Sequence, residues 1–458
     1  MEELVGADFG DLRLNERLVK IVEKVGNKPD AGIPEACEKP SQAKAAYRFL
    51  GHKAVTSNGI LRPHVARTVQ RARQFPRVLA IQDTTEINLT SHKSTDGLGY
   101  LAAPECRGIL LHNLMCVSTA GVPLGLLGQF PWTRDVVQLG KRTKRDKKQV
   151  GEKESQRWLE GLATVEEHLA GETRVVLIAD READLYDLFA KPRAANIDLL
   201  VRVYHHNRRV EHPVGHLKKA VLASPPRAVI EIDVPRRDDR PARKAQLTVR
   251  WCKLTVHEPA NYRGVPAAEP VELWFLHVCE ENPPPGEEPV EWLLATTLPI
   301  ESLADARQVL QWYTFRWRIE RFHYVLKSGC RIESRCLRTE KGMENLIAVL
   351  SLVAWRVLWM TYEARENPTA SCRVVFDKEE AEVLHLATHS RQNLPPQPIT
   401  IEQAVRDVAK LGGYLARRND PPPGVKTIWR GLRRLEDLTR GYKLARTPDA
   451  AASTKDYG

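Results

Sequence analysis

Four polar residues in the second half of the chain recur at helical spacing. They are Tyr313, Arg316, Glu320 and Lys327. On an α-helix of 3.6 residues per turn, their side chains project within an arc of roughly 60°. One helical face would therefore carry a carboxylate among groups that bind phosphate. A divalent cation would reconcile that carboxylate with a bound polyanion, so the spacing predicts metal-dependent phosphoryl transfer.

Two further acids accompany apolar runs of strand character. Asp83 stands near the end of RVLAIQDTT (77–85), and Asp180 ends RVVLIAD (174–180). Unbroken apolar, β-branched runs are typical of buried strands. Open sheets bind ligands near the ends of their strands. Both acids are therefore candidate metal ligands.

Each acid alone has an ordinary explanation. An aspartate after a strand is more often a turn former or a helix N-cap. Glu320 alone would be a surface residue paired with Arg316 or Arg321. The coincidence of all three acids with the helical pattern favours a shared site.

These motifs resemble those of DDE transposases of the bacterial insertion-sequence kind, typified by the transposase of transposon five. The matching segments are IQDTT (81–85), DREAD (180–184) and the Tyr-x2-Arg-x3-Glu-x6-Lys signature from Tyr313 to Lys327. The resemblance extends from about Gly10 to about Tyr442. It implies an α/β fold with a ribonuclease-H-like catalytic core, in which a mixed sheet is flanked by helices.

An insertion is expected between the second and third acids. Asp180 and Glu320 are 140 positions apart, far more than a simple crossover needs. Strand-like runs lie at 228–234, 245–251, 271–278 and 291–297. We expect an all-β insertion at about 205–300, as the family carries there. The expected domains are a helical DNA end-binding domain (1–75), a catalytic domain (76–370), a helical dimerisation region (371–446) and a disordered tail (447–458).

The resemblance implies a cut-and-paste transposase that binds inverted-repeat ends, cleaves through a DNA hairpin and joins the ends to target DNA. Asp83, Asp180 and Glu320 would be catalytic and hold Mg²⁺ (or Mn²⁺), as two ions. The signature residues Tyr313, Arg316 and Lys327 would clamp DNA phosphates. The alternatives are a catalytically silent end-binding inhibitor, a domesticated DNA-binding protein, and a general two-metal nuclease.

Four other residues match DNA-contacting positions of the family. Trp292 would stack on a flipped base, although a core tryptophan in a strand would look the same. Arg208 is the matching basic residue nearby, with one extra residue in HHNR (205–208). Lys44 and Arg48 would contact the transposon end, or would simply belong to an amphipathic helix.

Charge favours a polyanionic partner. Lysine and arginine outnumber acids by 69 to 58, which gives +11 and a pI near 9.2. Basic runs lie at 140–148, 205–209 and 236–244, with a looser cluster near 426–434. We expect DNA contact most at 205–209, after a strand at the edge of the catalytic sheet.

The resemblance implies a bacterial protein that is nucleoid-associated when bound to DNA, and other features lead us to expect a cytoplasmic location. Its 8 cysteines show no zinc-finger spacing, and MEELVGADFG lacks a secretory signal. The apolar stretch 345–362 is expected to be a buried helix rather than a membrane span. Amphipathic helices are expected at 401–417 and 424–442. LGG (411–413) and WRG (429–431) match the family's dimerisation region, so the resemblance implies a homodimer, with capping of the core as the alternative.

Overall fold

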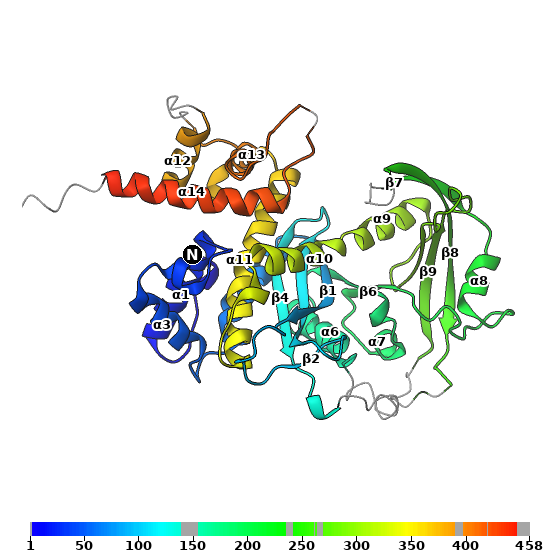
Figure 1. Cartoon of the computed structure of the whole chain (residues 1–458). Helices are drawn as coiled ribbons and strands as arrows, with labels where there is room; N and C mark the ends of the chain where they lie inside the picture. The colour runs from blue at the N-terminus through cyan, green and yellow to red at the C-terminus, as the bar shows by residue number, and fades with distance from the viewer. Residues whose placement is uncertain are drawn as a thin grey trace, which may run out of the picture.

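The structure is a computed structural model that describes residues 2–138, 154–234, 241–260, 262, 269–389, 397–418 and 420–446. The basic run 140–148, most of the run 236–244 and the expected tail 447–458 lie outside the described residues. A central sheet joins helices at one end of the molecule to a long ribbon of strands at the other (Figure 1).

The core of the protein is a mixed sheet with ribonuclease-H-like topology. Its strands are β1 (Arg77–Asn88), β2 (Gly99–Tyr100), β3 (Arg107–Ser118), β4 (Pro123–Trp132), β5 (Arg174–Ala179) and β6 (Ile197–Arg202). Strand β3 pairs antiparallel with β1 and β4, while β1, β5 and β6 run parallel side by side. The predicted fold class is confirmed.

Alternate residues of the core strands face two different helical layers. Leu79 and Ile81 of β1 and Ile178 of β5 belong to the buried cluster that includes helices α10 (Trp317–Tyr324) and α11 (Glu340–Glu366). Val78 and Ala80 belong to the opposite cluster, with helices α6 (Gln156–Leu169) and α7 (Tyr186–Ala190). Side chains alternate between the faces of a strand, so the odd-numbered positions of β1 point toward α10.

The inserted strands occur where the sequence predicts them. They are β7 (Ala228–Val234), β8 (Arg243–Val256), β9 (Val271–Cys279) and β10 (Glu291–Thr296). Strand β10 pairs with β6, so the insertion extends the core sheet, which has ten strands within the described residues. The insertion is not purely β, because it contains helix α8 (Leu217–Ala223). Strand β6 is also an interior strand, so the predicted edge position before residues 205–209 is wrong.

Helices form the two ends of the chain. The N-terminal ones are α1 (Leu12–Asn27), α2 (Ile33–Cys37), α3 (Pro40–Leu50) and α4 (Ser57–Ala72), and the C-terminal ones are α12 (Lys378–Thr388), α13 (Ile401–Leu411) and α14 (Val425–Arg446). Helix α4 packs on β4, where the backbone N–H of Leu126 donates to Nε2 of buried His64 over 2.9 Å. Helix α13 ends at Leu411 rather than at the predicted Arg417.

Helix α11 is the one helix among the described residues that is long and apolar enough to cross a membrane, and 83% of its most apolar window is buried inside the protein. It lies between the N-terminal helices and the core sheet (Figure 1). Its Trp355 donates through Nε1 to the carbonyl of Pro123 over 3.1 Å. The expectation of a buried helix at 345–362 is confirmed.

Candidate active site

Asp83 and Asp180 lie next to each other because their strands are adjacent and parallel. Ile81 of β1 pairs with Ile178 of β5, and each aspartate comes two residues later. Since Ile81 and Ile178 face α10, alternation along the strand directs both aspartates to that face. Asp83 still lies within β1, whereas Asp180 follows β5 and caps a short 3₁₀ helix, η4 (Arg181–Ala183), by accepting from the N–H of Glu182.

Glu320 lies on α10, but the helix around it is not the single helix that the spacing predicts. Helix α9 (Leu303–Thr314) ends before Phe315, α10 begins at Trp317, and a π-helical turn, η5, follows at Val325–Gly329. The prediction of one unbroken helix is wrong, because Phe315 and Arg316 form a turn whose N–H groups bond to carbonyls three residues earlier, but Arg316 still reaches Glu320. Ile319 and Phe322 are buried, which leaves Glu320 partly exposed beside the strand acids.

One guanidinium group joins the first and third acids. Nη1 of Arg316 lies 3.2 Å from Oδ2 of Asp83, and Nη2 lies 2.5 Å from Oε1 of Glu320. Nε of Arg316 is buried without a hydrogen-bond partner among the described residues. Arg316 therefore offsets the negative charge of two carboxylates, while its Nε–H group donates no hydrogen bond within the described residues.

The electrostatics of Asp83 show how closely the acids are gathered. The pKa of its carboxyl is raised to about 7, chiefly because burial removes it from water. The nearby carboxylates of Asp180 and Glu320 also raise this pKa, and the Arg316 guanidinium opposes them. A buried carboxyl among like charges favours a bound cation.

This raised pKa predicts a pH-dependent stability of the metal-free protein. Folded Asp83 keeps a proton that the unfolded chain has released above its ordinary pKa of 3.8. The retained proton stabilises the folded state at low pH. The free energy of unfolding should therefore lose this contribution as the pH rises from about 4 to about 7. Urea denaturation in EDTA measures this. Asp83→Asn should lose that contribution, and identical pH profiles for the two proteins would contradict it.

The donor set suits a hard divalent cation. The three acids supply only carboxylate oxygens, which Mg²⁺ prefers to nitrogen or sulfur. Their oxygens do not all lie within 4.8 Å of one another among the described residues, and Arg316 lies between two of them. The residues present fit a hard divalent cation, and Arg316 now contacts two of the three carboxylates.

A buried polar chain that the sequence did not reveal holds α10 against the sheet. Nδ2 of Asn113, the β3 partner of Asp83, lies 3.0 Å from Nε2 of His323. Gln129 of β4 donates to Oδ1 of Asn113 over 2.7 Å and to Ser351 of α11 over 2.8 Å. Burial lowers the pKa of His323 to about 3, so its imidazole is neutral. In the sequence, the only indication that His323 belongs near the site is its position three residues after Glu320.

The last acid of the DREAD motif has a structural partner. Asp184 is buried and accepts from the backbone N–H groups of Tyr204 and His205, each over 2.8 Å. It also forms an ion pair with Arg208, whose side chain is 7% exposed. The guanidinium of Arg208 thus ties the segment after β6 to the turn after β5. Its contact with DNA stays a prediction, since it is engaged internally here.

Trp292 and Tyr313 are brought together beside the acids. Their ring centroids are 6.2 Å apart at 63°, an edge-to-face contact. Tyr313 is buried, and burial raises the pKa of its hydroxyl. Two residues of β10 line a pocket of about 390 Å³. The lining residues are Arg181, Arg202, Val203, Tyr204, His206, Glu291 and Leu293. This pocket therefore contains basic side chains, and its lining includes the sequence neighbours of Asp180 and Trp292.

The remaining predicted DNA-binding residues, Lys327, Lys44 and Arg48, lie on the helical segments η5 and α3. Lys327 is half-buried within η5. Lys44 and Arg48 are exposed on one face of α3, and the opposite face is buried through Ala46 and Phe49. Helix α3 thus has one packed apolar face and one exposed basic face.

The glycine elements near the C-terminus bring two helices of the same chain together. A Cβ at Gly412 would lie 1.8 Å from the carbonyl oxygen of Thr427, and one at Gly431 would lie 1.8 Å from that of Val408. Trp429 packs over Gly329 in η5 and lies near Tyr324, with ring centroids 5.8 Å apart. The C-terminal helices therefore contact the end of the helix that carries Glu320.

The fold and the matched families together define the class. The family model described as transposase DNA-binding matches residues 1–55, transposase DDE domain matches residues 136–356, and transposase Tn5 dimerisation domain matches residues 352–451. These are a DNA-binding region, a DNA-cleaving domain and a dimer-forming region. The chain belongs to the DDE transposases of the Tn5-like kind. Asp180 and Glu320 fall within the DDE match, and Asp83 precedes it.

Proposed function

We propose that this transposase works by cut-and-paste: it binds the inverted-repeat ends of a bacterial transposon, cleaves both strands through a DNA hairpin, and inserts the ends into target DNA. The observation that supports this most strongly is the gathering of Asp83, Asp180 and Glu320 from β1, the end of β5 and α10, with one guanidinium between Asp83 and Glu320. Such a gathering of acids is needed for metal-dependent phosphoryl transfer and has no evident structural purpose.

Each member of the site has a proposed role. Asp83, Asp180 and Glu320 would hold two Mg²⁺ or Mn²⁺ ions, which supply an activated water or 3′-hydroxyl and stabilise the leaving oxygen. Arg316 would release its acids and turn to a DNA phosphate, where its fork can bind two oxygens. Tyr313 and Lys327 would fix the phosphates on either side.

The domain organisation is also part of the proposal. The end-binding domain, the catalytic domain with its insertion and the dimerisation region would have the limits given above. Helix α4, placed here within residues 1–75, packs against β4 and α11, and the DNA-binding match ends at residue 55. Helix α4 would thus move with the catalytic core. The dimer would be the form that synapses two ends in the bacterial cytoplasm.

Lys44→Ala with Arg48→Ala should weaken end binding at moderate salt. Both side chains are exposed on α3, and removing one cation that neutralises a phosphate should reduce the salt slope of log K by about 1. Filter binding across a salt series measures the slope. Lys378→Ala, on the exposed start of α12, is the control. An unchanged slope in the double variant would remove α3 from the interface.

Trp292→Ala should nick transposon ends normally and form hairpins poorly. Its ring can offset the unstacking of a base, which costs about a few kcal/mol, whereas first-strand nicking needs no flipped base. Denaturing gels resolve nicked, hairpin and open ends. Trp274→Ala is a matched control, because Trp274 is a partly buried tryptophan on the neighbouring strand β9. Unimpaired hairpin formation would mean that Trp292 only packs within the sheet.

Cleavage of paired end DNA with Mg²⁺ tests the whole proposal. The protein should cut end DNA at the transposon boundary and leave a scrambled duplex of equal length intact. Binding without cleavage would indicate a silent end-binding protein, and equal cleavage of both duplexes would indicate a general nuclease.

A further inference from the structure

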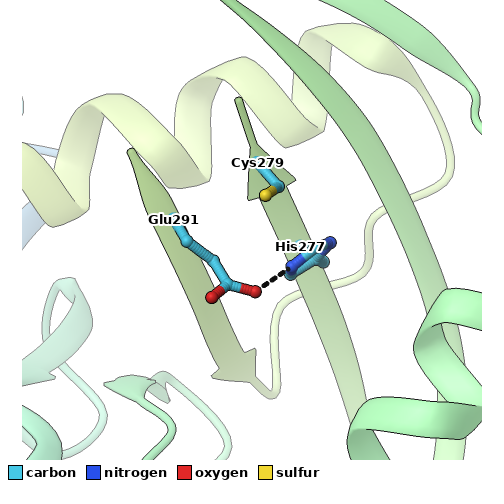
Figure 2. Close-up of side chains that lie close together, drawn as sticks. All are labelled: His277, Cys279 and Glu291. Carbon is cyan, nitrogen blue, oxygen red and sulfur yellow. Dashed lines mark hydrogen bonds and ion pairs between the residues drawn. The ribbon is translucent and has the colours of Figure 1, made fainter. Parts of the chain in front are cut away.

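A second group of potential ligands lies in the insertion, away from the three acids. A ring nitrogen of His277, Sγ of Cys279 and a carboxylate oxygen of Glu291 all lie within 4.8 Å of one another. Figure 2 shows the three side chains converging in front of β9 and β10. Among the described residues this is the one such cluster of three.

The register of the sheet produces this cluster. His277 and Cys279 are two positions apart on β9, so they share a face. Cys279 pairs directly with Glu291 on β10, and cross-strand partners also share a face. Three ligand types from two strands are thus held by backbone pairing before any ion binds.

The surroundings are suited to a cation. Nε2 of His277 lies 2.8 Å from Oε1 of Glu291, and Nζ of Lys218 from α8 lies 2.7 Å from the same oxygen (Figure 2 shows the first contact). An ammonium group therefore lies where a metal would supply positive charge. Nδ1 of His277, whose side chain is 2% exposed, has no hydrogen-bond partner among the described residues.

Metal binding requires a neutral imidazole and a deprotonated thiol. Burial lowers the pKa of His277, which favours its neutral imidazole. Cys279 is a free, half-buried thiol, and burial raises its pKa. Metal binding would release its proton to solvent, as thiolate coordination requires. Glu291 also lines the pocket of about 390 Å³ described above, which gives an ion a path of entry.

We propose that His277, Cys279 and Glu291 form a Zn²⁺ site, separate from the acids at 83, 180 and 320. Imidazole, thiolate and carboxylate are the ligands of protein zinc, with three protein ligands leaving the fourth position for water. Mg²⁺ prefers oxygen ligands, so the two sites would select different metals. Binding moves Lys218 off the carboxylate and joins β9 to the first residue of β10, immediately before Trp292.

Cobalt titration of the full-length protein in the presence of Mg²⁺ tests the site. Cobalt held by a thiolate gives a ligand-to-metal charge-transfer absorption, which an all-carboxylate site cannot give. We expect the band to saturate at one equivalent and to disappear when Zn²⁺ is added. Cys279→Ser should abolish it, while Cys252→Ser, a half-buried cysteine on the neighbouring strand β8, and Asp83→Ala should retain it.

Glu291→Gln is a second variant that keeps the Cys279 thiol, so it tests the site even if Cys279→Ser misfolds. Loss of even an outer partner of a metal ligand costs about 10–100-fold in affinity, so Zn²⁺ should bind this variant at least about tenfold more weakly. Absence of the cobalt band in the wild-type protein would overturn the site. So would a band that survives Cys279→Ser. Neither result depends on DNA cleavage, so failure here is distinct from failure of the proposed function.

Discussion

Asp83→Ala, Asp180→Ala and Glu320→Ala should each slow Mg²⁺-dependent cleavage of end DNA by at least about 1000-fold. The loss of about 4 kcal/mol of transition-state stabilisation produces that factor, and a missing metal ligand removes several kcal/mol. Single-turnover cleavage under saturating protein gives the rate. End binding should stay within a few fold, because we expect α3, not the acid site, to hold the end.

The conservative variants sharpen this result. Asp83→Asn keeps the shape and one oxygen but loses the charge, so it should be nearly as inactive as Asp83→Ala. Glu182→Gln is a matched control, since Glu182 lies on η4 beside Asp180. Normal cleavage by any of the three alanine variants would remove that residue from the site.

Arg316→Ala should reduce cleavage by about 100-fold, the effect of losing one charged donor at a reacting phosphate. The variant should also bind Mg²⁺ no more weakly than the wild type, because Arg316 now competes for Asp83 and Glu320. Arg316→Lys should recover only part of the activity, since an ammonium cannot bind two oxygens in the fork geometry.

The neighbouring Arg321 provides the control for this variant. It is exposed on α10 one residue after Glu320, so Arg321→Ala removes a nearby positive charge without touching the acids. Equal decreases in cleavage by Arg316→Ala and Arg321→Ala would mean that overall charge, rather than a specific clamp, explains the effect.

The strands that carry the acids could be predicted from sequence because their signal is local. Apolar runs end close to Asp83 and Asp180, and the inserted strand β8 has its own alternating pattern. Pairing between distant strands leaves no such mark. The joining of β10 to β6, which extends the core sheet into the insertion, therefore emerged only from the structure.

The helix at Glu320 shows a different limit. Its residues suit a continuous helix, and the break at Phe315 and Arg316 arises from tertiary packing, with Phe315 buried and Arg316 drawn onto Asp83. Arg208 illustrates the same point, because its buried partner Asp184 is 24 positions away. The proposed zinc ligands were equally hidden, since the sequence separation of Cys279 and Glu291 says nothing of their register.

The most direct measurement is the position of Mn²⁺, located by its anomalous scattering, in crystals of the protein bound to cleaved end DNA. We predict manganese between Asp83, Asp180 and Glu320, in contact with the DNA terminus, with Arg316 moved from the acids to a phosphate. Manganese bound elsewhere, with Arg316 still bridging Asp83 and Glu320 beside the DNA end, would contradict this assignment of the active site.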